Sequence, residues 1–124
     1  MEMRKILIAD DEQSIRMLVK KILNRNYIIL EADNGKRAVD MAQNEKPDLI
    51  LMDLMMPEMD GNTACYTLKA NQTTSEIPVV MLTVVGYELN KKLSKDVIGA
   101  DGYMTKPFNP YELRDIIRNL LPCL

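Results

Sequence analysis

The 124-residue sequence contains no histidine, and that absence removes several classes of active site. Without histidine there is no histidine-based acid or base, no serine–histidine nucleophile, and few of the usual zinc sites. The two cysteines, Cys65 and Cys123, have neither metal-ligand spacing nor a redox CxxC pattern. We expect both to behave as small apolar side chains in a reducing compartment.

Long apolar runs and a strong excess of one charge are missing too. No apolar run is long enough to cross a bilayer, and the segment Met1–Asp11 is too short and too charged for a signal peptide. The net charge of −2 and the pI of about 5.2 favour neither nucleic-acid binding nor an anionic membrane. We therefore expect a cytoplasmic protein whose residues 1–124 form one domain with a hydrophobic core.

What the sequence does contain is an unbroken alternation of strand-like and helix-like segments. The predicted strands are the apolar runs Arg4–Ala9, Tyr27–Ala32, Asp48–Met52, Pro78–Leu82 and Asp101–Thr105. Apolar residues with a helical period follow each run, at Ile15–Leu23, Gly35–Asn44, Ala64–Asn71, Leu89–Val97 and Leu113–Leu121. The third and fourth runs lack polar alternation, as strands buried on both faces should. The order predicts an α/β fold: a doubly wound (βα)5 parallel sheet with helices on both faces.

Polar side chains stand at the ends of these predicted strands. Asp10 and Asp11 follow the first strand, Asp53 the third, Thr83 the fourth and Lys106 the fifth. Because the carboxyl ends of parallel strands share one edge, we expect these side chains to meet in a pocket. Three crowded carboxylates resist ionising together, and a divalent cation with oxygen ligands removes that conflict. With a hydroxyl and an ammonium, they are the parts needed to hold a hard cation and a phosphoryl group.

Each of these residues, taken singly, has a simpler explanation. Adjacent acids before a helix usually cap it, and a strand-end threonine usually caps nearby backbone. Lys106 alone would be a solvated lysine in a loop, and the residues leave open whether the Lys106–Pro107 bond is cis. Only the combination predicts the pocket.

The chain resembles the receiver domain of two-component response regulators, of the chemotaxis-type single-domain kind, over essentially its whole length. The motifs that carry the resemblance are ILIADDE, LILMDLMMPEMDG, VVMLT and GADGYMTKPF. The resemblance implies a flavodoxin-like receiver fold and Mg²⁺-dependent transfer of a phosphoryl group from a partner kinase's phosphohistidine. Such a domain catalyses only its own phosphorylation and dephosphorylation and is not a turnover enzyme.

The resemblance also implies roles for residues at matching positions. Asp53 would be the phosphoacceptor. Asp11, Asp53 and the backbone carbonyl of Met55 would ligate Mg²⁺ directly, or Mn²⁺ in its place, with Asp10 acting mostly through water. Lys106 would hold a phosphoryl oxygen.

A switch is implied as well. Thr83 would hold a second phosphoryl oxygen and move toward it, which opens space into which Tyr103 can turn. The face formed by the fourth helix, fifth strand and fifth helix would then change shape as a population shift. The implied partners are a sensor histidine kinase or histidine phosphotransfer protein, a downstream protein on that face, and a second copy in a homodimer, with no nucleic acid and no membrane.

Three apolar residues near the acceptor depart from the usual pattern. Val84 stands where the family usually has alanine or glycine, and it would narrow access to the phosphoryl group. Met55 and Val85 occupy the positions where the family tunes hydrolysis of the acyl phosphate, and neither can orient a water. We therefore expect a long-lived phosphorylated state.

Other functions fit the residues less well. An aspartyl-phosphate phosphatase commonly carries a second aspartate two residues after its nucleophile, where this chain has Met55. A nucleotide- or flavin-binding module would need GxxxxGK[ST], GxGxxG or an equivalent phosphate loop, which is missing. The intact acids, threonine and lysine argue against a degenerate receiver that serves only as a binding module.

Overall fold

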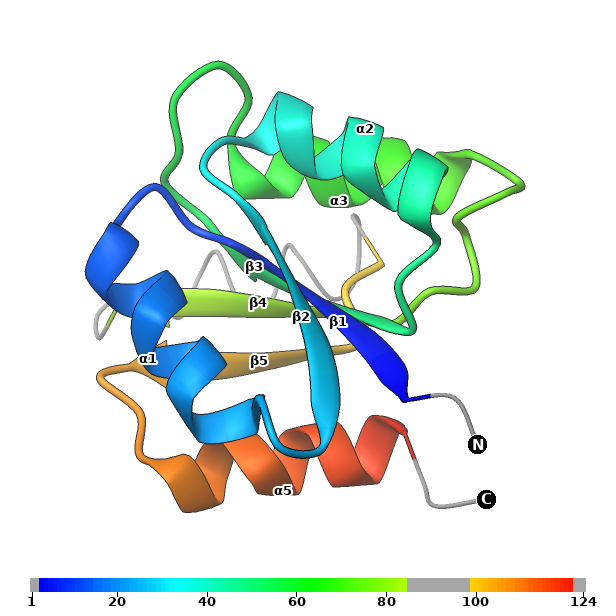
Figure 1. The fold of residues 1–124 in the computed structure, drawn as a ribbon. Helices are drawn as coiled ribbons and strands as arrows, with labels where there is room; N and C mark the ends of the chain where they lie inside the picture. Colours follow the sequence, from blue (N-terminus) through cyan, green and yellow to red (C-terminus); the bar gives the residue numbers. More distant parts are fainter. Residues whose placement is uncertain (1–2, 85–98, 122–124) are drawn as a thin grey trace.

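The structure is a computed structural model and describes residues 3–84 and 99–121 of the chain (Figure 1). The elements are β1 (Arg4–Ala9), α1 (Gln13–Leu23), β2 (Tyr27–Ala32), α2 (Gly35–Glu45), β3 (Leu49–Asp53), α3 (Gly61–Ala70), β4 (Val79–Val84), β5 (Gly102–Lys106) and α5 (Pro110–Leu120). The helix predicted at Leu89–Val97 lies outside the described residues, as do Val85 and Cys123.

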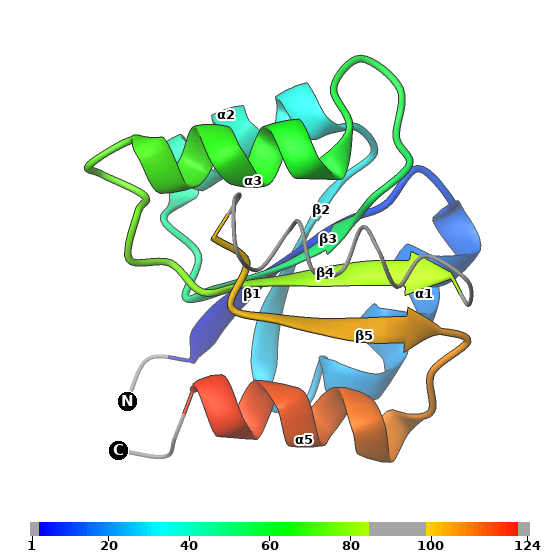
Figure 2. The same cartoon turned by 180° about the vertical axis from the view of Figure 1, so that it is seen from behind.

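All five strands belong to one parallel sheet in the order β2-β1-β3-β4-β5. Helices α1 and α5 cover one face of the sheet, and α2 and α3 cover the other (Figures 1 and 2). This is a doubly wound α/β order whose switch point lies between β1 and β3, where ligands bind at the carboxyl edge. The predicted fold class is confirmed.

The core lies on both faces of the sheet. Strand β3 is buried along its whole length, and β4 is buried up to Thr83. Side chains alternate between faces. Ile50 and Met52 therefore pack into the cluster under α2 and α3, while Leu49 and Leu51 join the cluster under α1 and α5. This double burial explains the near-continuous apolar runs of the central strands.

Three strands extend farther than their apolar runs predicted. Asp53 is the last residue of β3 and pairs with Leu82, Thr83 pairs with Thr105 inside the sheet, and Lys106 is the last residue of β5. The prediction that these polar residues follow their strands was therefore wrong by one or two residues. The reason is that ladder hydrogen bonds involve the backbone and continue under a polar side chain.

Helix ends are set by local caps. Asn34, Asp60 and Asn109 accept hydrogen bonds from backbone N–H groups in the first turns of α2, α3 and α5, and Asn109 forms a capping box with Glu112. The Lys106–Pro107 bond is cis. Among the described helices, none combines the length and the apolar character needed to span a membrane.

Candidate functional site

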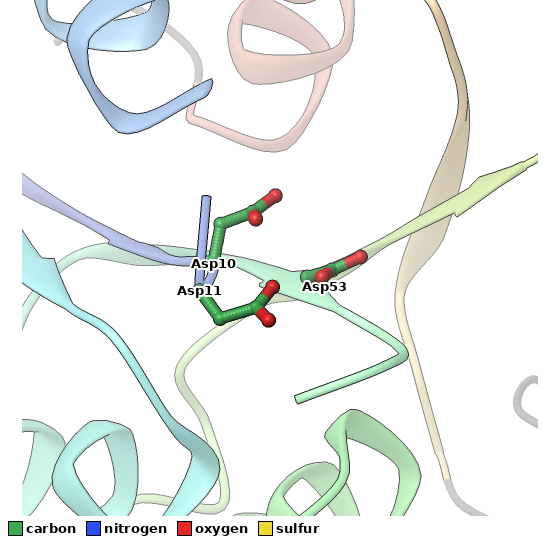
Figure 3. A group of neighbouring side chains, drawn as sticks. All are labelled: Asp10, Asp11 and Asp53. Carbon is green, nitrogen blue, oxygen red and sulfur yellow. The ribbon is translucent and has the colours of Figure 1, made fainter. Parts of the chain in front are cut away.

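The carboxyl edge of the sheet brings three aspartates together. Asp10 and Asp11 follow β1, Asp53 ends β3, and one carboxylate oxygen from each lies within 4.8 Å of the others (Figure 3). Asp10 is fully buried, Asp53 is 7% exposed, and Asp11 is exposed. The crowding expected at this edge is therefore present, with two of the carboxylates nearly out of water.

Lys106 comes from β5, on the far side of β4, and its ammonium joins the two buried acids. Its Nζ lies 2.7 Å from Asp10 Oδ2 and 3.1 Å from Asp53 Oδ1. The carboxylate of Glu12 lies 3.8 Å from the same Nζ. The side chain of Lys106 is 12% exposed, so these contacts replace much of its hydration. Lys106 is thus part of the pocket and not a solvated loop lysine.

The charges in this pocket shift the ionisation of their neighbours. Burial raises the pKa of Asp53 to about 6, helped by repulsion from Asp10 and Asp11, although the hydrogen bond and charge of Lys106 pull it down. Burial alone would lower the pKa of Lys106, but the hydrogen bonds to Asp10 and Asp53 and the negative charges of both acids together outweigh burial and raise it. Ionising Asp53 in this pocket is therefore costlier than ionising a solvated aspartate.

Asp10 is held from several directions. Its Oδ1 accepts from the backbone N–H of Glu12 at 2.9 Å, and its own N–H donates to the carbonyl of Ala32 at 3.0 Å. Arg16 donates from Nη1 to the Asp10 carbonyl at 2.8 Å and from Nε to Glu31 at 3.2 Å. Sequence reasoning missed Arg16, because nothing in a charged residue on an amphipathic helix reveals a backbone contact to the loop before it.

The loop from β3 to α3 depends on a close backbone approach. Gly61 donates its N–H to the carbonyl of Leu54 at 2.8 Å, and a Cβ on Gly61 would collide with the carbonyl oxygen of Asp53. A Cβ on Gly35 would likewise collide with the carbonyl oxygen of Met59. The sequence has a turn-like run here, Pro57-Glu58-Met59-Asp60-Gly61, but the contact of Gly61 with Asp53 was not predictable from it. These glycines fix the backbone that follows the central aspartate.

A small cavity of about 20 Å³ opens beside Asp53. Its lining is apolar apart from the carboxylate and consists of Asp53, Leu54, Met55, Leu82 and Val84. Met55 is 67% exposed and Val84 is 47% exposed, so both side chains stand at its mouth. That Val84 narrows access to a phosphoryl group on Asp53 stays a prediction.

Thr83 and Tyr103 lie on the neighbouring strands β4 and β5. Thr83 is 5% exposed, and Tyr103 is half-buried and packs against the core cluster under α2 and α3. Thr83 pairs with Thr105, two residues from Tyr103, so Thr83 and Tyr103 project from the same face of the sheet. Within the described part of the chain, no hydrogen bond joins the Thr83 hydroxyl to the three aspartates.

The donor set suits a hard divalent cation. Carboxylate oxygens are the ligands that Mg²⁺ prefers, and an exposed Asp11 leaves one side open for waters or a phosphate. The raised pKa of Asp53 is the expected mark of acids assembled for a cation. The residues present therefore fit Mg²⁺, with Lys106 as the fixed positive charge.

The model of the response regulator receiver domain family matches residues 6–118. The chain is 45% identical over 116 residues to histidine kinase P4 of Formosa agariphila; the match covers 94% of this chain and 8% of that protein. It is 41% identical over 119 residues to the alkaline phosphatase synthesis transcriptional regulatory protein PhoP of Bacillus subtilis, covering 95% of this chain and 48% of that protein. The chain thus spans half or less of the length of these relatives.

Solved structures agree with this assignment. The chemotaxis protein CheY4 of Vibrio cholerae superposes with a TM-score of 0.90 at 32% identity, covering 97% of this chain and all of that one. A signal receiver domain of a histidine kinase from Syntrophus aciditrophicus gives a TM-score of 0.86 at 34% identity, covering 95% of this chain and 89% of that one. By sequence model and by fold, the chain belongs to the response regulator receiver domain family.

Proposed function

We propose that this chain accepts a phosphoryl group on Asp53 from the phosphohistidine of a partner protein in two-component signalling. The observation that carries the proposal is the contact of Lys106 Nζ with both Asp10 and Asp53, beside the exposed carboxylate of Asp11. This arrangement provides a nucleophile, a fixed cation and a cation site at one edge of the sheet.

Asp11, Asp53 and the backbone carbonyl of Met55 would hold Mg²⁺, or Mn²⁺ in its place, and Asp10 would act mostly through water. When bound, the ion supplies positive charge against the oxygens of the transferring phosphoryl group. The protein's own part is to keep the acid oxygens within 4.8 Å of one another. Lys106 holds Asp10 and Asp53 in place and offers its ammonium to a phosphoryl oxygen.

The transfer is a displacement at phosphorus. A carboxylate oxygen of Asp53 forms the new O–P bond, the P–N bond to the donor histidine breaks, and the leaving ring nitrogen keeps the electron pair. Asp53 must be ionised to attack, and Lys106 favours that form by its charge and hydrogen bond. The product is an acyl phosphate on Asp53.

The acyl phosphate would act as a switch. Phosphorylation adds close to two negative charges and three acceptor oxygens, and the Thr83 hydroxyl would move to contact one of them. Tyr103 would turn into the vacated space, and the face that includes β5 and α5 would change shape for a downstream protein or a second copy. The fourth helix expected on this face lies outside the described residues.

The proposed phosphoryl donor is a sensor histidine kinase or a histidine phosphotransfer protein. The proposed location of this chain is the cytoplasm. The relatives named above are a histidine kinase and a transcriptional regulatory protein, and this chain matches only a part of the length of each. These partners are inferred from that resemblance and from the chemistry of Asp53.

One labelling experiment tests the function. The protein is incubated with Mg²⁺ and acetyl phosphate, and the phosphate bound to it is measured by mass and by its stability in acid and base. We expect one acid-stable, base-labile phosphate, and none in the Asp53→Asn variant. Steady consumption of donor without labelled protein would favour an aspartyl-phosphate phosphatase, and no labelling would favour a binding module.

The lifetime of the phosphorylated state is a second measurable property. Met55 is apolar and 67% exposed beside Asp53, so it cannot position an attacking water. We expect the Met55→Asn variant to lose its phosphate faster than the wild type. An unchanged rate of dephosphorylation would contradict a role for Met55 in setting the lifetime.

A further inference from the structure

Strand β2 forms one free edge of the sheet. It pairs with β1 along all six of its residues and stands at the end of the strand order, so its outer backbone groups have no strand partner among the described residues (Figure 1). Natural proteins usually protect such an edge with lysine, proline or a bulge. The sequence of β2, YIILEA, contains neither lysine nor proline, and its one charged residue, Glu31, is paired with Arg16 and Lys20 of α1. This edge is therefore suited to pairing with another strand.

The surface beside this edge is hollow and combines apolar with charged and polar side chains. Ile28 is 45% exposed, and Leu30, on the same face of the sheet, is partly buried. A cavity of about 490 Å³ lies between β2 and α2; its lining residues are Leu30, Met41, Arg37, Asp40, Asn44 and Glu45. A strand added to β2 would place its side chains over Leu30 and Met41, at the floor of this cavity.

We propose that the occupant is β2 of a second copy, paired antiparallel about a two-fold axis that passes through Ile29. A two-fold axis perpendicular to the joined sheet maps each face onto itself, so paired residues must lie on the same face. Because successive side chains alternate between faces, the axis has to pass through a residue and not between two residues.

The axis through Ile29 gives the best complementarity. Ile28 then faces Leu30 of the partner subunit, and this apolar pair occurs twice. Arg25 precedes β2 and Asp33 follows it, so this register brings opposite charges near each other at both ends of the paired strands; both side chains are exposed, and Asp33 also pairs with Arg37 at 3.5 Å.

The two neighbouring registers, with the axis through Leu30 or through Ile28, pair the strands less favourably. An axis through Leu30 would place both Ile29 and Tyr27 opposite acids, Glu31 and Asp33, whereas the axis through Ile29 places only Tyr27 opposite one, Glu31. An axis through Ile28 would pair only residues 27–29 of each strand. The self-complementary pattern of apolar and charged residues is what favours a second copy over an unrelated strand.

Sedimentation equilibrium of the unphosphorylated, metal-free protein tests this interface. We expect a concentration-dependent dimer, and a rise of about tenfold or more in its Kd for Ile28→Lys, since two lysines would be desolvated against Leu30. Tyr66→Lys is the matched control: Tyr66 is 59% exposed on α3, which packs on the central strand β3, and we expect no change. A monomer up to about 1 mM, or a dimer that Ile28→Lys leaves intact, would overturn the proposal.

Engineered cysteines test the register itself, in a Cys123→Ser background. Ile29→Cys places two thiols on the axis, at a Cα separation that a disulfide can span, and we expect a covalent dimer on mild oxidation. Tyr27→Cys alone should not cross-link, and Tyr27→Cys combined with Glu31→Cys should. Equal cross-linking by the two single variants would exclude this register.

Discussion

At the scale of single residues, the central feature is that Asp53, the proposed nucleophile, is costly to ionise. Asp53 is 7% exposed and lies beside two other carboxylates, and Lys106 offsets only part of that cost. Burial therefore raises its pKa from 3.8 to about 6. A group held in this way favours the binding of positive charge or of a proton.

This shift predicts a pH-dependent stability of the metal-free protein. Between pH 3.8 and about 6 the folded state binds more protons at Asp53 than the unfolded state, so this residue's contribution to stability falls as pH rises. We expect Asp53→Asn to be more stable than the wild type by about 1–2 kcal/mol at pH 8. The advantage should shrink toward pH 5. Urea unfolding in EDTA at both pH values measures it, and a variant less stable than the wild type at pH 8 would contradict the prediction.

A second residue-scale prediction concerns the opposite end of the sheet. Asp101 Oδ2 accepts from Val79 N–H at 2.8 Å and from Lys69 Nζ at 2.7 Å, and Lys69 also donates to the carbonyl of Ile77 at 2.7 Å. Asp101→Ala removes both bonds, and we expect a loss of about 1–3 kcal/mol of unfolding free energy. Asp115→Ala, which loses only an exposed ion pair with Arg118, should change it by less than about 0.5 kcal/mol.

At the scale of elements, the connection from β3 to α3 is what positions Asp53. The connection folds back so that Gly61, the first residue of α3, touches the carbonyl of Asp53, and Asp60 caps the helix by accepting from Thr63 N–H at 2.7 Å. A helix start and a strand end thus share one tight contact. We therefore expect the position of Asp53 to depend on that contact.

We therefore expect Gly61→Ala to impair both stability and phosphorylation. The added Cβ would collide with backbone atoms of Asp53 that cannot move without shifting the carboxylate, and the cost should be about 2 kcal/mol or more. Gly102→Ala is a suitable control, because its nearest obstacle is the flexible end of Ile116 at 3.3 Å. Denaturant unfolding and acetyl phosphate labelling give the two readouts. Full labelling of Gly61→Ala would argue against this coupling.

At the scale of the whole molecule, three strands and the loop after β1 meet at one edge. Cation binding to that edge should therefore stabilise the entire fold, since the unfolded chain cannot assemble the acids. At a Mg²⁺ concentration of ten times Kd, we expect about 1.4 kcal/mol of added stability. A rise in Tm with Mg²⁺ measures it.

Asp11→Asn provides the matching variant, because Asp11 is exposed and its loss should not prevent folding. We expect this variant to lose most of the Mg²⁺-dependent rise in Tm, and the exposed Asp40→Asn on α2 to keep it. A full rise in Asp11→Asn would remove Asp11 from the proposed ligands.

Much of the fold was predictable because its signals are local. The apolar runs and helical periods placed β1 and β2 at their observed bounds, and α1, α2, α3 and α5 within a few residues of theirs. The ends of β3, β4 and β5 were less predictable, because a strand ends where its backbone partner ends. That partner belongs to another strand, as with Thr83 and Thr105.

The sequence by itself determined the order of strands and helices, the parallel sheet, and the gathering of Asp10, Asp11 and Asp53 at one edge. The sequence also placed Lys106 at that edge, but only the tertiary structure decided that its ammonium contacts both Asp10 and Asp53, 96 and 53 residues away along the chain. It also decided the support from Arg16, the raised pKa of Asp53 and the exposed edge at β2. The physical reason is the distance along the chain over which each signal acts. Periodicity acts over a few residues, whereas burial, charge and edge exposure depend on which strands become neighbours.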